Sequence, residues 1–191
     1  MNKDIIVIGA SAGGFDAMKV LAGGLPPDLK ASIFAVLHIG PYGLGTLPEV
    51  LGRAGRLPAS NARDGEPIRP GRIYVAPPDR HLLVNRDGSI SLTQTELVHF
   101  VRPSADLLFE SVAASYKKRA IAVVLTGTGS DGSMGLAAVK KMGGTIIAQS
   151  EGSAEFFGMP GAAIHTGTVD FVLPLEEIAP AIITLVGGDE V

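Results

Sequence analysis

The chain contains five short runs that are almost entirely apolar, and this pattern limits its fold more than any other feature. They lie at residues 5–8, 32–38, 120–125, 145–148 and 169–173, and helical patterns separate them. Strands that are apolar on both faces are typical of parallel sheets covered by helices on both sides. The alternation of strands and helices implies right-handed crossovers. We therefore predict an α/β fold with a doubly wound, mostly parallel sheet in a Rossmann-like three-layer arrangement.

The pattern changes between residues 72 and 92. Residues 72–76, 81–84 and 89–92 have the composition of short strands, and Arg86-Asp87-Gly88 between the last two is a strong hairpin signal. We interpret this region as an antiparallel excursion inserted into the α/β chain. The segment 52–71 is predicted to be an extended surface connection. Helices are predicted at 13–21, 44–51, from 103, 133–142, 158–164 and 174–186.

Length and composition exclude several classes of protein. A chain of 191 residues is the size of one domain, so we assign residues 1–191 to a single domain. No apolar run approaches the roughly 18 residues of a membrane span, and no basic region precedes Asp4 as it would in a signal peptide. The absence of cysteine excludes disulfides and thiolate chemistry and is compatible with the cytoplasm. We expect no membrane insertion.

The charge balance does not favour nucleic acid as a partner. The formal net charge is −3, and the only basic cluster is residues 117–119. Basic side chains are favourable at the carboxyl end of a helix, so we interpret this cluster as a helix end.

A serine, a histidine and an aspartate each follow the end of a predicted strand. Ser11 follows the first strand, His38 the second, and Asp131 lies in the turn after the strand at 120–125. Ligands of doubly wound sheets bind beyond the carboxyl ends of the strands, so these side chains should face one edge. An imidazole can activate a serine hydroxyl, and a carboxylate orients the imidazole. We predict Ser11 as nucleophile, His38 as base and Asp131 as the orienting acid.

The glycine-rich turn around Ser11 suits an ester-hydrolysing site. A tetrahedral intermediate needs backbone N–H donors beside its developing oxyanion, and the start of a helix favours negative charge. Ala12, Gly13 and Gly14 occupy that position in the sequence. We predict that they bind the oxyanion.

The same residues allow other interpretations. Ser11 and Asp131 are suitable helix N-caps, and His38 is a suitable packed histidine at a strand end. The order Ser11, Asp131, His165 is that of α/β-hydrolases, and residues 9–13 match G-x-S-x-G, although only eight residues precede Gly9.

Phosphate and metal binding are further alternatives. The first turn lacks a full G-x-G-x-x-G, and His38 stands where a ribose-binding acidic residue is expected. The turn at 127–132 keeps phosphate binding open. His81 and His99 have no close ligand partner in the sequence, so metal binding is the weaker of the two alternatives.

Several segments, in the same order along nearly the whole chain, resemble the catalytic domain of the chemotaxis protein-glutamate methylesterase (CheB) family. Residues 8–14 resemble its nucleophile motif, and His38 and Asp131 fall on the positions of its base and triad acid. Later matching segments are Tyr74-Val75-Ala76-Pro77-Pro78, Pro103-Ser104-Ala105-Asp106, the turn at 125–132 and Gly158-Met159-Pro160.

The resemblance implies a cytoplasmic serine hydrolase that needs neither a metal nor an organic cofactor. It implies demethylation of glutamate γ-methyl esters on cytoplasmic chemoreceptor helices with release of methanol, and deamidation of receptor glutamines in many members. The family commonly has threonine in place of Ala12, glutamine and methionine in place of Leu37 and Ile39, and methionine in place of Thr128. Thr128 is therefore a candidate substrate-binding residue.

Two expectations follow from how this chain differs from the family. Members usually carry an amino-terminal receiver domain, for which there is no room before Ile5. Either this sequence is a piece of a longer chain, or the esterase stands alone, controlled by a separate receiver protein or by no partner. The alternative function is a catalytically impaired module that binds a receptor or a signalling regulator. Ala12 and Thr128, beside the predicted site, motivate it.

Overall fold

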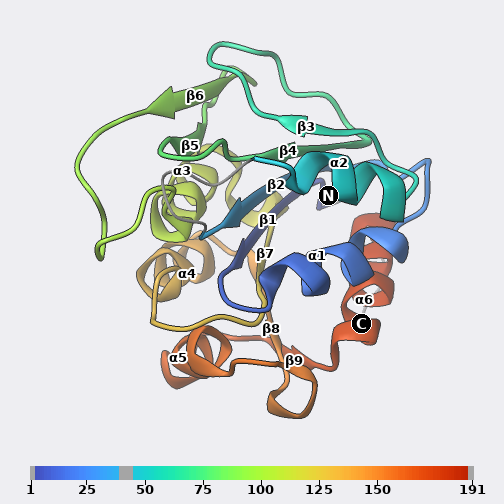
Figure 1. Cartoon of the computed structure of the whole chain (residues 1–191), viewed down its shortest axis with the longest axis vertical. Coiled ribbons are helices and arrows are strands. Elements are labelled where there is room, and N and C mark those ends of the chain that lie inside the picture. Colours follow the sequence, from blue (N-terminus) through green and yellow to red (C-terminus); the bar gives the residue numbers. More distant parts are fainter. Residues whose placement is uncertain (1–2, 39–44, 189–191) are drawn as a thin grey trace.

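The computed structural model describes residues 3–38 and 45–188. Its centre is a parallel sheet of seven strands in the order β3-β4-β2-β1-β7-β8-β9 (Figure 1). The strands are β1 (Ile5–Ala10), β2 (Ser32–Leu37), β3 (Ala59–Asn61), β4 (Arg72–Val75), β7 (Ala120–Val124), β8 (Thr145–Gln149) and β9 (Phe171–Leu173). Every neighbouring pair in this sheet is parallel. The predicted doubly wound α/β fold is confirmed.

Helices cover both faces of the sheet. On one face lie α1 (Gly14–Gly23), α2 (Leu47–Ala54) and α6 (Leu175–Gly187), and on the other α3 (Ala105–Tyr116), α4 (Ser133–Lys141) and α5 (Gly158–His165) (Figure 1). Side chains of β1 alternate between the two layers, since Ile6 and Ile8 join one buried cluster and Ile5 and Val7 the other. Burial on both faces explains why the central strands are apolar throughout.

The predicted hairpin is present. Strands β5 (His81–Val84) and β6 (Ile90–Thr93) pair antiparallel as a separate two-stranded sheet, and β5 packs against α3. The turn between them contains Gly88 at φ 81°, a backbone conformation that glycine adopts without strain.

Two neighbouring predictions were wrong. The strand at residues 72–75 pairs in parallel with β2, so it belongs to the main sheet and not to the antiparallel excursion. The connection predicted at 52–71 contains β3, which pairs with β4. Strands of three or four residues carry too little periodicity to indicate their partners. Leu44, the first residue of the predicted second helix, and Ile39 lie outside the described residues.

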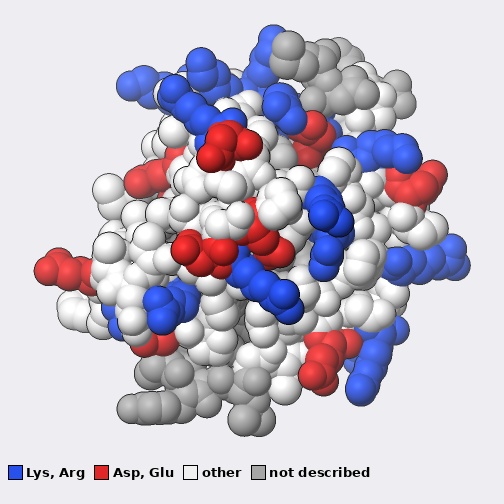
Figure 2. Space-filling view, turned by 90° about the horizontal axis from the view of Figure 1, so that it is seen from above, with Lys and Arg blue, Asp and Glu red and all other residues white. Residues whose placement is uncertain are grey.

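The surface of the described residues carries both signs of charge. Figure 2 shows basic and acidic side chains interspersed over the face seen from above. The basic cluster at 117–119 forms the short 3-10 turn η1 (Lys117–Arg119) directly after α3, as predicted. A second such turn, η2 (Glu151–Ser153), follows β8. Among the helices of residues 3–38 and 45–188, none has the length and apolar character needed to cross a bilayer.

Candidate active site

The candidate site lies where three adjacent strands end. Ser11 follows β1, His38 follows β2, and Asp131 lies in the loop between β7 and α4. The His38 amide donates to the Ala10 carbonyl over 3.0 Å, and the Ser11 amide donates to the Thr126 carbonyl over 3.1 Å. The hydrogen-bond ladder of the sheet thus continues past the strands. It holds the backbone of Ser11 between the ends of β2 and β7.

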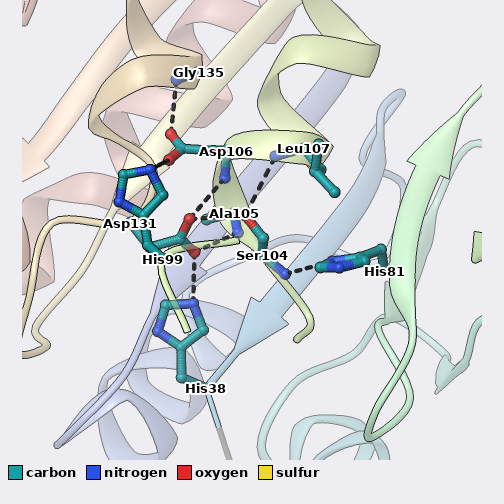
Figure 3. Close-up of polar contacts among 9 residues, drawn as sticks. All are labelled: His38, His81, His99, Ser104, Ala105, Asp106, Leu107, Asp131 and Gly135. Atoms are coloured by element: carbon teal, nitrogen blue, oxygen red, sulfur yellow. Dashed lines mark hydrogen bonds and ion pairs between the residues drawn. The ribbon is translucent and has the colours of Figure 1, made fainter. Parts of the chain in front are cut away.

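The structure brings His38 and Asp131 into direct contact. His38 Nε2 lies 2.6 Å from Asp131 Oδ2 (Figure 3). The two side chains are only 10% and 5% exposed, so water screens their interaction weakly. Because Asp131 occupies Nε2, the second ring nitrogen, Nδ1, is the one available for a reacting group.

Ser11 lies at the same edge without contacting that pair through its hydroxyl. Within the described residues, no hydrogen bond joins Ser11 Oγ to His38. Ser11 is partly buried, and the backbone of Gly127 passes close beside it. A Cβ atom on Gly127 would lie 2.8 Å from the Cβ of Ser11 and 2.5 Å from the sulfur of Met159. Only glycine allows this approach of the β7–α4 loop to Ser11.

The amino-terminal turn of α3 binds the carboxylate of Asp131. The Ser104 hydroxyl donates to Oδ1 over 2.8 Å, the Ala105 amide to Oδ2 over 2.6 Å, and the Asp106 amide to Oδ1 over 3.2 Å. Burial raises the pKa of Asp131, but the hydrogen bonds from His38, Ala105 and Ser104 outweigh burial and hold the pKa below its ordinary value. The positive end of a helix also favours a negative charge. Asp131 is therefore ionised at neutral pH.

The contact with α3 was missing from the sequence predictions. Asp131 had a possible structural role as the cap of the helix that follows it, but α4 has no side-chain cap, and Asp131 binds the start of α3 instead. The only signal was Pro103-Ser104-Ala105-Asp106, which predicted a helix start. Ser104 is indeed the N-cap of α3. Nothing in that motif indicates that its free amides face a loop 25 residues further along the chain.

The predicted oxyanion donors divide into two groups. The Gly14 amide donates to the Ser11 carbonyl over 2.8 Å, so it closes the turn and is not available to a substrate. The amides of Ala12 and Gly13 have no hydrogen-bond partner among the described residues. Gly13 has φ 74°, which turns the chain sharply from β1 into α1.

A cavity of about 280 Å³ opens onto the histidine–aspartate pair. Thr128, the predicted substrate-binding residue, is exposed and lines it. The described residues that line the cavity come from the end of β2, the segment before α3 and the β7–α4 loop: His38, His99, Phe100, Val101, Thr128, Gly129, Ser130 and Asp131.

The other histidines have different partners. His165, at the end of α5, contacts the Gly161 carbonyl of its own helix through Nδ1 at 2.7 Å. Asp131 contacts His38 and His165 contacts its own helix, so the structure does not support the α/β-hydrolase order with His165. His81 is fully buried and contacts only backbone groups through its two nitrogens. Among residues 3–38 and 45–188, no group of three or more histidine and acidic side chains is arranged to hold a metal ion.

Comparison with known proteins assigns this chain to a family. The family model described as CheB methylesterase matches residues 6–182. The protein-glutamate methylesterase/protein-glutamine glutaminase 2 of Caulobacter vibrioides is 44% identical over 183 residues, which are 94% of this chain and 53% of that protein. A putative protein of the same name from Leptospira interrogans is 42% identical over 97% of this chain and 96% of its own length.

The fold has a close counterpart among solved structures. The crystal structure of the Thermotoga maritima CheB methylesterase catalytic domain superposes with a TM-score of 0.93 at 36% identity. The match covers 97% of this chain and all of that one. The chain spans about half the length of the Caulobacter relative and nearly all of the Leptospira relative.

Proposed function

This chain belongs to the CheB methylesterase family, and on that premise we propose that it is a serine hydrolase that removes methyl groups from glutamate γ-methyl esters of chemoreceptors. The observation that carries the proposal is the 2.6 Å contact between His38 and Asp131 beside Ser11 at one edge of the sheet. We place the reaction in the cytoplasm, on the cytoplasmic helices of the receptor. The domain at residues 1–191 supplies all catalytic groups.

The first half of the reaction forms an acyl-enzyme. Ser11 Oγ attacks the ester carbonyl and passes its proton to Nδ1 of His38, the nitrogen that Asp131 leaves available. Asp131 stabilises the imidazolium through Nε2. The amides of Ala12 and Gly13 donate to the oxyanion of the tetrahedral intermediate. Collapse of the intermediate breaks the bond to the methoxy group, which takes the proton from His38 and leaves as methanol.

The second half hydrolyses the acyl-enzyme. His38 Nδ1 takes a proton from water, whose oxygen attacks the acyl carbonyl. The bond to Ser11 Oγ then breaks, the proton returns to that oxygen, and the glutamate carboxylate is released. With a glutamine substrate the same residues release ammonia in place of methanol, in keeping with the glutaminase activity in the names of the relatives.

The alternative of a catalytically impaired binding module is not favoured. It was motivated by Ala12 and Thr128, but Ala12 contributes a backbone amide, which its side chain does not change. Thr128 lies at the exposed side of the cavity. Neither substitution removes a proposed catalytic group.

The test is methanol release from methylated receptor fragments. Ser11→Ala should lower the rate of release by about 10⁴-fold or more, because the nucleophile is lost. Ser150 offers a matched control, since it directly follows β8 at the same edge of the sheet. Ser150→Ala should leave the rate within a few-fold of wild type. Full activity of Ser11→Ala would remove Ser11 from the mechanism.

A further inference from the structure

A second carboxyl group lies beside Asp131 and has no role in the mechanism above. Asp106, in the first turn of α3, has a side chain only 4% exposed. Its Oδ1 accepts the Gly135 amide over 2.7 Å, whereas Oδ2 is buried without a hydrogen-bond partner among the described residues. An unpartnered buried carboxylate oxygen is costly. Its presence at this position needs an explanation.

A second histidine faces that oxygen. His99 Nε2 lies 3.8 Å from Asp106 Oδ2, and its side chain is 43% exposed beside the cavity (Figure 3). His99 and Phe100 have φ angles of 49° and 65°, which are uncommon for residues other than glycine. They form a turn closed by hydrogen bonds of 3.1 and 2.9 Å between Val98 and Val101. Strained turns of this kind are maintained by their surroundings and cluster at functional sites.

The turn is anchored at its base. Arg102 donates to Asp79 Oδ1 from Nε over 2.8 Å and from Nη2 over 2.6 Å, and its Nη1 donates to the Thr95 carbonyl over 2.6 Å. A planar guanidinium with three such contacts fixes the chain on both sides of the turn. His99 is thus held beside the cavity and near the Asp106 carboxyl.

Two histidine–carboxylate pairs therefore share the first turn of α3. His38 pairs with Asp131, and His99 approaches Asp106. The Asp106 amide, which donates to Asp131 Oδ1 over 3.2 Å, connects them. The titratable groups that act on Asp106 are Asp131 from the β7–α4 loop and His99 from the turn, while α4 contributes the Gly135 amide, which does not titrate.

Asp106 changes its charge close to neutral pH. Burial, and next the negative charge of Asp131, raise its pKa to about 6 against the opposing effects of the Gly135 amide and His99. The protonated form is neutral and the ionised form adds a second negative charge behind Asp131. The charges of Asp106 and Asp131 act on one another because both side chains are almost completely shielded from water.

We propose that Asp106 is a positioning residue of the esterase site, whose ionised carboxylate stabilises the imidazolium that His38 forms during acyl transfer, and that His99 favours this ionisation from the cavity. The inference rests on the proposed function. It gives a role to the buried carboxylate oxygen of Asp106 and to the turn that brings His99 to 3.8 Å from it.

The experiment measures kcat/KM for methanol release between pH 5 and 9, together with the titration of the Asp106 carboxyl by carbon NMR. In the wild type, part of the fall in kcat/KM toward low pH (the acid limb) should occur over the same pH range as the titration of the Asp106 carboxyl. Asp106→Asn retains an oxygen for the Gly135 amide but cannot ionise. We expect it to lose that part of the acid limb and to lower kcat/KM at pH 8 by roughly tenfold.

His99→Gln tests the coupling on a partly exposed turn. The attraction of His99 lowers the pKa of Asp106, so without it the titration of the Asp106 carboxyl and the acid limb of kcat/KM should both move to higher pH. Asp170→Asn is a matched control. Asp170 also accepts a backbone amide, that of Ile146, and lies before β9, at the opposite edge of the sheet. The Asp170→Asn substitution should leave the pH dependence of kcat/KM unchanged.

The outcomes separate this inference from the proposed function. The positioning role of Asp106 would be overturned if Asp106→Asn left the pH dependence of kcat/KM unchanged, or lowered kcat/KM by the same factor at every pH. Either result would leave the proposed esterase function intact. The positioning role would also be overturned if, in His99→Gln, the acid limb of kcat/KM did not follow the titration of the Asp106 carboxyl. Failure of the wild type to release methanol would refute the proposed function and this inference together.

Discussion

His38 and His81 both connect to the start of α3, but their ring nitrogens are used differently. His38 is linked to it through Asp131, whereas His81 contacts Ser104 directly. His81 is fully buried, its Nδ1 accepts the Ser104 amide over 3.1 Å, and its Nε2 lies 3.0 Å from the Glu96 carbonyl. Since Nδ1 is an acceptor, Nε2 carries the proton and donates it to that carbonyl. Two backbone groups thus hold His81 in one neutral tautomer. His38 has one carboxylate partner, one available nitrogen and a cavity beside it.

The two histidines differ in the properties that a general base needs. Proton transfer requires a nitrogen that is free to accept and a partner that stabilises the charged ring. His38 meets both conditions, whereas His81 meets neither because its hydrogen bonds use both nitrogens. Ser104 connects the two regions, since its amide binds His81 and its hydroxyl binds Asp131. His81 therefore helps to shape the turn that binds the carboxylate of Asp131.

Substitution of His38 should cause a large loss of activity with little loss of stability. We expect His38→Gln to lower kcat/KM for ester hydrolysis by about 10⁴- to 10⁶-fold, because in the proposed mechanism His38 takes the proton of Ser11. The melting temperature should change by only a few degrees, since His38 lies at the rim of a cavity. Methanol release and thermal unfolding by circular dichroism measure the two effects. A mild loss of activity in His38→Gln would contradict the difference in role that we assign to His38 and His81.

Substitution of Asp131 should affect both properties, with a defined dependence on pH. We expect Asp131→Asn to lower kcat by about 10³- to 10⁴-fold, because the imidazolium loses its partner. The pKa of Asp131 is lowered in the folded state, so its contribution to stability is present above the ordinary aspartate pKa and is lost as the pH falls through the folded value. The unfolding free energies of variant and wild type, measured in urea, should differ more at pH 7 than at pH 3.

The Asp131 prediction has a clear contrary outcome. An equal difference in unfolding free energy at pH 3 and pH 7 would show that the ionised carboxylate contributes nothing through the α3 amides.

Substitution of His81 should reverse the pattern seen for His38. His81→Leu leaves the Ser104 amide and the Glu96 carbonyl without partners, and we expect it to lower the free energy of unfolding by about 1 to 3 kcal/mol. The folded fraction should retain kcat/KM within about tenfold of wild type, because His81 does not face the cavity. Urea unfolding and active-site-normalised rates test this. A loss as large as that of His38→Gln would contradict it.

Substitution of His165 should have the smallest effect. Its only described side-chain hydrogen bond is to the Gly161 carbonyl of its own helix. His165→Ala should therefore change kcat/KM by less than about twofold and the free energy of unfolding by about 0.5 kcal/mol or less. A loss above a hundredfold would restore the α/β-hydrolase order Ser11, Asp131, His165.

Much of the fold could be read from local pattern. The apolar runs identified the buried parallel strands, and Arg86-Asp87-Gly88 identified the hairpin. The failures came from the shortest elements. The partners of β4 and the existence of β3 depend on which backbone groups lie opposite them in space, and three or four residues carry little of that information.

The pattern of apolar runs was enough to predict that Ser11, His38 and Asp131 follow strands of one parallel sheet and hence lie at one edge. That result needs only the period of burial and the handedness of the crossovers. Only the tertiary structure decided that Asp131 binds Nε2 of His38, that the amides of α3 hold its carboxylate, and that Asp106 and His99 lie behind it. These contacts join loops from different parts of the chain. Their geometry depends on how α3 packs against β1, which no local pattern records.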